Sequence, residues 1–136
     1  MADNIPTQAP VKGGAVPYLS LDGAVKAVDF YKRAFGAEVV ALNPPDENGR
    51  TMHAHLYING SSVMLSDFFP EHGHTVVPVS GFNIMLVTND IDALYQRAVD
   101  AGATATMPPQ DMFWGDRYGQ LKDPFGVTWA LNQGQP

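Results

Sequence analysis

The chain contains an internal repeat with a period of about 66 residues, and this repeat constrains the fold more than any other feature of the sequence. Gly36-Ala37 recurs as Gly102-Ala103, and Leu65 recurs as Leu131, each 66 positions later. Tyr31 and Arg33 recur as Tyr95 and Arg97 at a displacement of 64. Self-similarity at a fixed period indicates one supersecondary unit used twice.

Each half begins with the pattern of a strand followed by a helix. Alternating residues over 16–21 predict a strand, Asp22 is a predicted N-cap, and apolar residues at helical spacing over 24–35 end at Gly36. In the second half a strand is predicted over 82–87, a cap at Asn89 or Asp90, and a helix from Ile91 to Gly102. The two halves therefore share one order of elements.

Behind each helix the pattern predicts three more strands. Residues 38–42 and 104–107 are prone to form strands, and a Pro-Pro loop is expected after each. Asn59-Gly60 favours a two-residue hairpin turn, and Asp123-Pro124-Phe125-Gly126 favours a type I turn. Each half is therefore predicted to be a βαβββ module, and the fold class is α+β.

Composition excludes several classes of function. The chain has 136 residues, a formal net charge of −6 and no cysteine. Without a basic cluster nucleic acid and anionic membranes are poor partners, and without cysteine there are no disulfides, zinc ribbons or iron–sulfur clusters. Neither a signal-peptide pattern nor a membrane-spanning run is present, so we expect a soluble, cytoplasmic protein. We expect a tail over 1–14, one domain over 15–132 and a tail over 133–136. The domain would hold modules at 15–67 and 82–132, joined by a loop at 68–81.

The tandem βαβββ order carries a resemblance to a known superfamily. Together with Gly-Arg-Thr-Met-His-Ala-His-Leu (49–56), Val-Met-Leu-Ser-Asp (63–67), Met-Phe-Trp-Gly-Asp-Arg-Tyr-Gly (112–119) and Asp-Pro-Phe-Gly (123–126), it resembles the vicinal oxygen chelate superfamily. That superfamily includes glyoxalase I, bleomycin-resistance proteins and extradiol dioxygenases, and the PhnB-like branch is the nearest in pattern. The resemblance implies a curved mixed sheet that forms a cup with helices outside, and a homodimer.

Metal-dependent members of this superfamily place four ligands in the cup, and this chain departs from their pattern. Ala130 stands where the last strand normally carries a carboxylate, and Met64 is its equivalent in the first half. Asn83 and one of residues 16–18 occupy the remaining positions. None of these is a good ligand for a divalent ion, so we expect no metal cofactor.

Strand alternation predicts what lines the cup instead. If Met64 and Ala130 face inward, so do the residues two positions away on the same strands, whereas Val63, Leu65, Trp129 and Leu131 pack under the helices. This mixture of hydroxyl, amide, thioether and phenol groups suits an organic ligand. The inward set is Tyr18, Ser20, Ser62, Met64, Ser66, Asn83, Met85, Thr128, Ala130 and Asn132.

His53 and His55 lie two residues apart on a predicted strand and so share one face. Three interpretations stay open: a strand pair without a role, contacts or a general base for a bound ligand, and a relocated metal site. The metal site would need a third ligand, for which His72 or His74 is the nearby candidate. The resemblance to PhnB-like members at His53 favours a ligand-contacting role.

Two aromatic segments complete the candidate site. Trp114 and Arg117 lie in the run 111–117, which is expected at the mouth of the cup, where they could clamp an anionic or planar ligand. Alternatively, Arg117 pairs with Asp116 or Asp123 and Trp114 caps the core. Phe68-Phe69-Pro70 indicates a lid or a dimer contact.

The sequence thus predicts a metal-free protein that binds a small organic ligand, in the manner of bleomycin-resistance proteins. The alternative is a metal-dependent lyase, isomerase or dioxygenase that uses His53 and His55. Whether the chain catalyses a reaction is left open.

Overall fold

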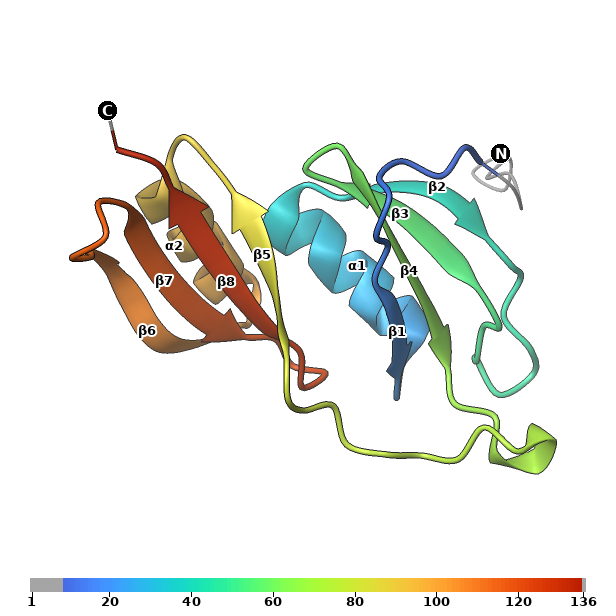
Figure 1. Ribbon diagram of the computed structural model, residues 1–136. Coiled ribbons are helices and arrows are strands. Elements are labelled where there is room, and N and C mark those ends of the chain that lie inside the picture. Colours follow the sequence, from blue (N-terminus) through green and yellow to red (C-terminus); the bar gives the residue numbers. More distant parts are fainter. Residues whose placement is uncertain (1–8, 136) are drawn as a thin grey trace. The chain divides into compact units, whose positions relative to one another are not determined.

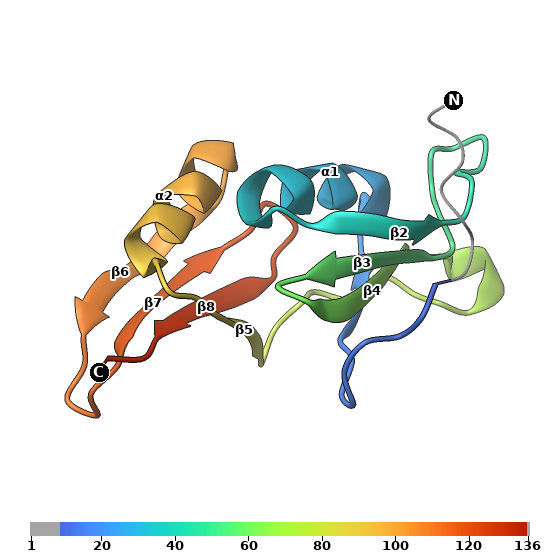
Figure 2. The same ribbon diagram turned by 90° about the horizontal axis from the view of Figure 1, so that it is seen from above.

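The structure, a computed structural model, describes residues 9–135 (Figure 1). It divides into two compact units, the first made of residues up to 78 except 33–35, and the second of 33–35 and the residues from 79. Each unit carries a mixed four-stranded sheet, with one helix against one face (Figure 2). The α+β class and the tandem βαβββ order are confirmed. Residues 1–8 of the predicted N-terminal tail, and Pro136, lie outside the described residues.

The first unit follows the predicted order closely. Its elements are β1 (Tyr18–Leu21), α1 (Ala24–Phe35), β2 (Glu38–Leu42), β3 (Ala54–Ile58) and β4 (Ser61–Asp67), followed by the short 3-10 helix η1 (Pro70–His72). The strands lie in the order β1-β4-β3-β2, and only the β1–β4 pair is parallel. The β3–β4 hairpin turns at Asn59-Gly60, where both residues have positive φ, as the predicted turn requires.

The second unit repeats this order with one departure. Its elements are β5 (Asn83–Val87), α2 (Ile91–Ala101), β6 (Thr104–Asp111), β7 (Arg117–Lys122) and β8 (Thr128–Gln133), with the sheet order β5-β8-β7-β6. A loop was expected at Pro108-Pro109, but β6 continues through both prolines. An edge strand tolerates proline, and the register between β6 and β7 shifts from Met107 to Gln110 around them. The expected loop is therefore wrong in this half.

The N-terminus of α1 also differs from the prediction. Asp22 does not cap the helix; Gly23 occupies the cap position with φ of 98° and provides no side-chain hydrogen bond. Asp67, at the end of β4, instead accepts from the backbone N–H groups of Gly23 (2.9 Å) and Ala24 (3.0 Å). The sequence signal missed this cap because the capping residue lies 43 positions away. In α2 the local prediction is confirmed, since Asp90 accepts from the Ala93 N–H.

The core lies between each sheet and its helix. Leu65, Trp129 and Leu131, which strand alternation predicts to pack under the helices, are almost completely buried. The Trp129 indole N–H donates to Asp123, which also accepts from two backbone N–H groups in the predicted turn at 123–126. Among residues 9–135, no helix is long and apolar enough to span a bilayer.

Candidate functional site

The open face of each sheet, the face turned away from its helix, carries the predicted lining residues. In the first unit the register places Tyr18 beside Met64 and Met64 beside His55, so one row of side chains crosses β1, β4 and β3. The next row pairs Ser20 with Ser66. We call these two rows, one of Tyr18, Met64 and His55 and the other of Ser20 and Ser66, the polar row pair. It brings five of the sequence-predicted site residues together on a single sheet.

Tyr18 and His53 form a hydrogen-bonded pair at this surface. The Tyr18 hydroxyl lies 3.0 Å from Nδ1 of His53, and their ring centroids are 5.8 Å apart. Tyr18 is about half exposed (53%). Burial raises the pKa of the Tyr18 phenol, and the Ser66 side chain acts in the opposite direction, with the smaller effect. At neutral pH Tyr18 is therefore a protonated hydrogen-bonding group that faces solvent beside an imidazole.

His55 occupies a different environment although it lies only two residues from His53. It is 2% exposed, and its Nε2 atom lies 2.7 Å from Oγ of Ser62. Burial and the neighbouring His53 both lower the pKa of His55. Ser62 Oγ also accepts from the backbone N–H of Lys12 at 2.8 Å, so residue 12 of the predicted tail is attached to this sheet. His55 is thus a buried neutral imidazole that links β3 to β4 through Ser62.

His74 is a member of this surface that the predicted site set did not include. Its Nε2 atom lies 2.9 Å from Oγ of Ser20, and its ring centroid is 5.1 Å from that of Phe68. The sequence singled out His74 only as a third metal ligand, because a loop histidine gives no periodic signal that would place it on a sheet face. Phe68 and Phe69 just before it are buried (7% exposed each).

The open face of the second unit combines amide, hydroxyl and apolar side chains. Met85 lies beside Ala130 in the parallel β5–β8 pair, and Gln120 flanks Ala130 on the other side. Asn83 lies two residues before Met85 on β5, and its neighbour on β8 is Thr128. Met85 is half exposed, whereas Ala130 is fully buried.

Arg117 lies at the start of β7 and is engaged by carboxylates. It donates to both carboxylate oxygens of Asp92 on α2 (2.9 and 3.1 Å) and to Asp111 (3.2 Å). The sequence had suggested Asp116 or Asp123 as its structural partner; the observed partners are Asp92 and Asp111. Trp114 is half exposed in the β6–β7 hairpin loop, with its ring centroid 5.8 Å from that of Tyr118.

The donor chemistry at the superfamily's ligand positions does not fit a divalent metal. Met64, Ala130, Asn83 and Tyr18, one of the three candidates at the fourth position, offer a thioether, a methyl group, an amide and a phenol. The register pairs Met64 with Tyr18, but it pairs Ala130 with Met85 and Asn83 with Thr128. Within residues 9–135 there is also no group of three or more histidine, aspartate or glutamate side chains placed to hold a metal ion. His53 and His55 contact Tyr18 and Ser62 instead.

The comparison with protein families decides the relationship that the fold suggests. The model of the Glyoxalase/Bleomycin resistance protein/Dioxygenase superfamily matches residues 21–131. The chain belongs to this superfamily. The uncharacterized protein Rv0887c of Mycobacterium tuberculosis is 44% identical over 123 residues, which cover 86% of this chain and 72% of that protein.

Solved structures of other proteins show the same fold. Protein PA1353 from Pseudomonas aeruginosa matches with a TM-score of 0.74 and 28% identity, over 91% of this chain and 99% of that one. The PhnB protein from Bacillus cereus matches with a TM-score of 0.64 over 90% and 100% of the two chains, at 23% identity. At 23% identity, the likeness to the PhnB protein concerns the fold alone. The resemblance read from the sequence is confirmed.

Proposed function

We propose that this superfamily member binds a small, uncharged organic molecule on the open face of its first unit. The observation that carries the proposal is the hydrogen-bonded Tyr18–His53 pair, in which Tyr18 belongs to the polar row pair and is about half exposed. Hydroxyl and imidazole groups beside the Met64 thioether can hold a ring and its hydrogen-bonding substituent together.

The charge of the surface favours a neutral ligand over an anion. The side chains of the polar row pair are phenol, hydroxyl, thioether and imidazole groups, and none carries a formal charge when the histidines are neutral. Arg50 and Arg117, which could bind an anion bidentately, are each held by two carboxylates. A carboxylate or phosphate would therefore lose hydration here without gaining a free guanidinium.

The proposal assigns binding and no chemical step. Tyr18 and His53 would contact the polar group of the ligand, Met64 its apolar part, and His55 would hold the strand face in place through Ser62. The metal-dependent alternative has no observation in its favour, because both histidines have other partners and the described residues form no three-ligand group.

The test uses 1-naphthol as a probe, with naphthalene and 1-naphthyl phosphate as matched compounds. Protein labelled at the methionine methyl groups reports binding through the Met64 signal. We expect a saturable shift with 1-naphthol, at a dissociation constant of about a millimolar, as is usual for a fragment. We expect at least threefold weaker binding of the other two compounds.

The variants sharpen this test. Tyr18→Phe and His53→Gln should each weaken 1-naphthol binding at least threefold, whereas Tyr118→Phe on the second unit should leave it unchanged. If the Met64 signal does not move, or if the phosphate binds better than the alcohol, the proposed function is wrong.

A further inference from the structure

The segment after β4 folds back on itself and returns to the open face of the first unit. η1 spans Pro70–His72, and Gly73 follows with φ of 84°, a conformation that favours glycine. The N–H groups of His72 and His74 both donate to the carbonyl of Phe69 (2.9 and 3.0 Å). The turn 69–74 is therefore closed by its own backbone, and it begins at a buried phenylalanine.

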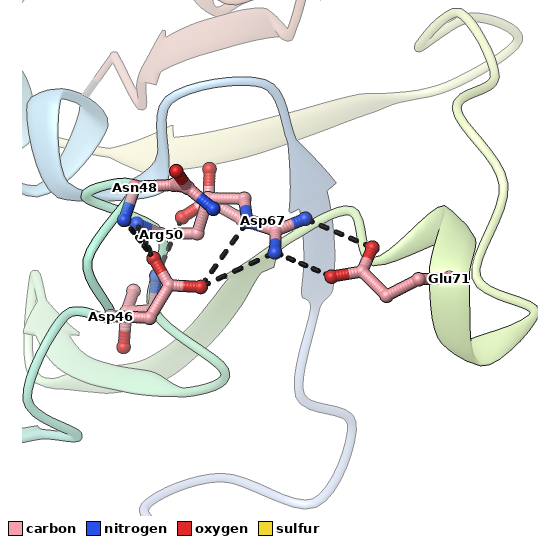
Figure 3. A network of polar contacts seen from close by, with 6 residues as sticks. Asp46, Asn48, Arg50, Asp67 and Glu71 are labelled. Carbon is pink, nitrogen blue, oxygen red and sulfur yellow. Dashed lines mark hydrogen bonds and ion pairs between the residues drawn. The ribbon is translucent and has the colours of Figure 1, made fainter.

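Arg50, which lies in the β2–β3 loop, binds this turn through Glu71 (Figure 3). Its two terminal nitrogens donate to the two carboxylate oxygens of Glu71, one of them at 3.1 Å. Its guanidinium carbon also lies 4.5 Å from the centroid of the Phe69 ring. A bidentate pair with a stacked guanidinium fixes orientation as well as distance.

The loop that carries Arg50 is itself ordered by Asp46. The Asp46 side chain accepts from the backbone N–H groups of Asn48 and Arg50, both at 2.9 Å, and also pairs with the Arg50 side chain. These contacts appear together in Figure 3. Because these contacts already restrict the Arg50 side chain, less conformational entropy is lost when it pairs with Glu71. Hydrogen bonding from Arg50 also lowers the pKa of Glu71 to about 2, so the pair stays ionised at neutral pH.

The contacts of Arg50 and Glu71 with the turn 69–74 determine where His74 lies. The turn ends with His74 Nε2 at 2.9 Å from Ser20, and Ser20 lies beside Ser66 in the polar row pair. His74 is partly exposed, and Ser20, which it contacts, lies two residues from Tyr18 on β1.

We propose that His74 is a further ligand-contacting residue, and that Arg50 and Glu71 are positioning residues that hold the turn 69–74 so that His74 stays on the open face. The inference rests on the proposed function and extends it, because it adds a contact from outside the strands. It gives a role to an ion pair that would otherwise be only a surface contact.

The first experiment measures 1-naphthol binding in a double-mutant cycle. Glu71→Gln and His74→Ala should each weaken binding at least threefold, and Glu71→Gln should have no additional effect in the His74→Ala background, because it acts through His74. Glu47→Gln, the same chemical change in the β2–β3 loop, is the matched control and should bind like the parent. Binding by Glu71→Gln that equals the parent's, or losses that simply multiply in the double variant, would overturn the inference.

The second experiment does not depend on binding. Acylation of His74 by diethyl pyrocarbonate, followed by mass spectrometry, should be at least threefold faster in Glu71→Gln than in the parent or Glu47→Gln, because the His74–Ser20 contact loosens. Equal rates would overturn the positioning role. If the parent fails to bind 1-naphthol while the acylation rates differ as expected, the proposed function is wrong and the positioning of His74 by Glu71 is confirmed.

Discussion

Asp67 and Gln133 occupy equivalent positions 66 residues apart, at the ends of β4 and β8. The side chain of each accepts a hydrogen bond from the first backbone N–H group of the helix in its own unit. Asp67 accepts from Ala24, and Gln133 accepts from Ile91 at 2.8 Å. Asp67 also accepts from the backbone N–H groups of Gly23 and Thr51. The repeat thus preserves a long-range cap in both modules, with a charged and more heavily used version in the first.

The first prediction concerns this cap. Asp67→Ala should lower the free energy of unfolding by about 2–4 kcal/mol, because it leaves three backbone donors unpaired, two of them at a helix N-terminus. Gln133→Ala should cost about 1 kcal/mol, since it removes one acceptor. Urea unfolding measures both. Asp22→Ala is the control and should be near neutral; a loss as large as that of Asp67→Ala would contradict the assignment.

The element order could be predicted from the sequence because it depends on local signals. Asn59-Gly60 and Gly36 each act over a few residues, and both are confirmed. The failures involve partners distant in the sequence. Asp67, and not Asp22, caps α1 because the end of β4 lies against the start of α1. These two segments come together only in the folded sheet.

The candidate site follows the same division. Strand alternation placed Tyr18, Met64 and Ser66 on one face, because the period of two is intrinsic to a strand. His74 could not be placed in this way, since it reaches Ser20 through the turn 69–74, which Arg50 contacts through Glu71. Likewise, the choice of Asp92 as the partner of Arg117 depends on how α2 packs on the sheet.

The second prediction concerns Gly119 on β7. A Cβ atom at this position would lie 2.9 Å from the carbonyl oxygen of Met107 and 3.1 Å from the nitrogen of Pro109, both backbone atoms. Gly119→Ala should therefore destabilise the protein by about 1–3 kcal/mol through overpacking. Gly14→Ala, where nothing lies within 4 Å and φ is not positive, should be neutral. Thermal unfolding of the two variants makes the comparison, and equal melting temperatures would refute the close approach.

The third prediction concerns pH. Burial and His53 lower the pKa of His55 below 6.5 in the folded state, so the unfolded chain binds the proton more tightly. The stability that the neutral imidazole contributes is therefore complete above about pH 6.5 and decreases as pH falls through the folded-state pKa. Urea unfolding between pH 5 and 8 should show a steeper acid loss for the parent than for His55→Gln. Parallel curves would contradict the assignment, as would a His55 ring signal that titrates above the value of a model peptide.

The fourth prediction is that the protein is a homodimer. β1, β2, β5 and β6 are edge strands of the two sheets, and Phe82, Met85 and Val87 expose about half or more of their surface at β5. Exposed edges and apolar side chains favour pairing with a second copy. Light scattering at micromolar concentration should give twice the chain mass of 14.7 kDa. A particle of the single-chain mass would exclude the dimer, and Met85→Lys with Val87→Lys should shift the mass toward it.

The last prediction is that zinc does not stabilise the parent protein. A ligand that binds only the folded state must raise the melting temperature, and a zinc site needs three or four donors. His53 and His55 provide two imidazoles; His53 contacts Tyr18, and the strand neighbour of His55 is Met64. Stoichiometric zinc should therefore move the parent's melting temperature by less than about one degree.

Met64→Glu provides the positive control for that measurement. It places a carboxylate in the row beside His55, so the variant should be less stable than the parent without metal, because the charge is partly buried beside apolar groups. It should regain stability with zinc, since two imidazoles and a carboxylate form a plausible ligand set. If instead the parent melts several degrees higher with zinc and His53→Ala loses that gain, then His53 takes part in a metal site, and the metal-dependent alternative replaces the proposed function.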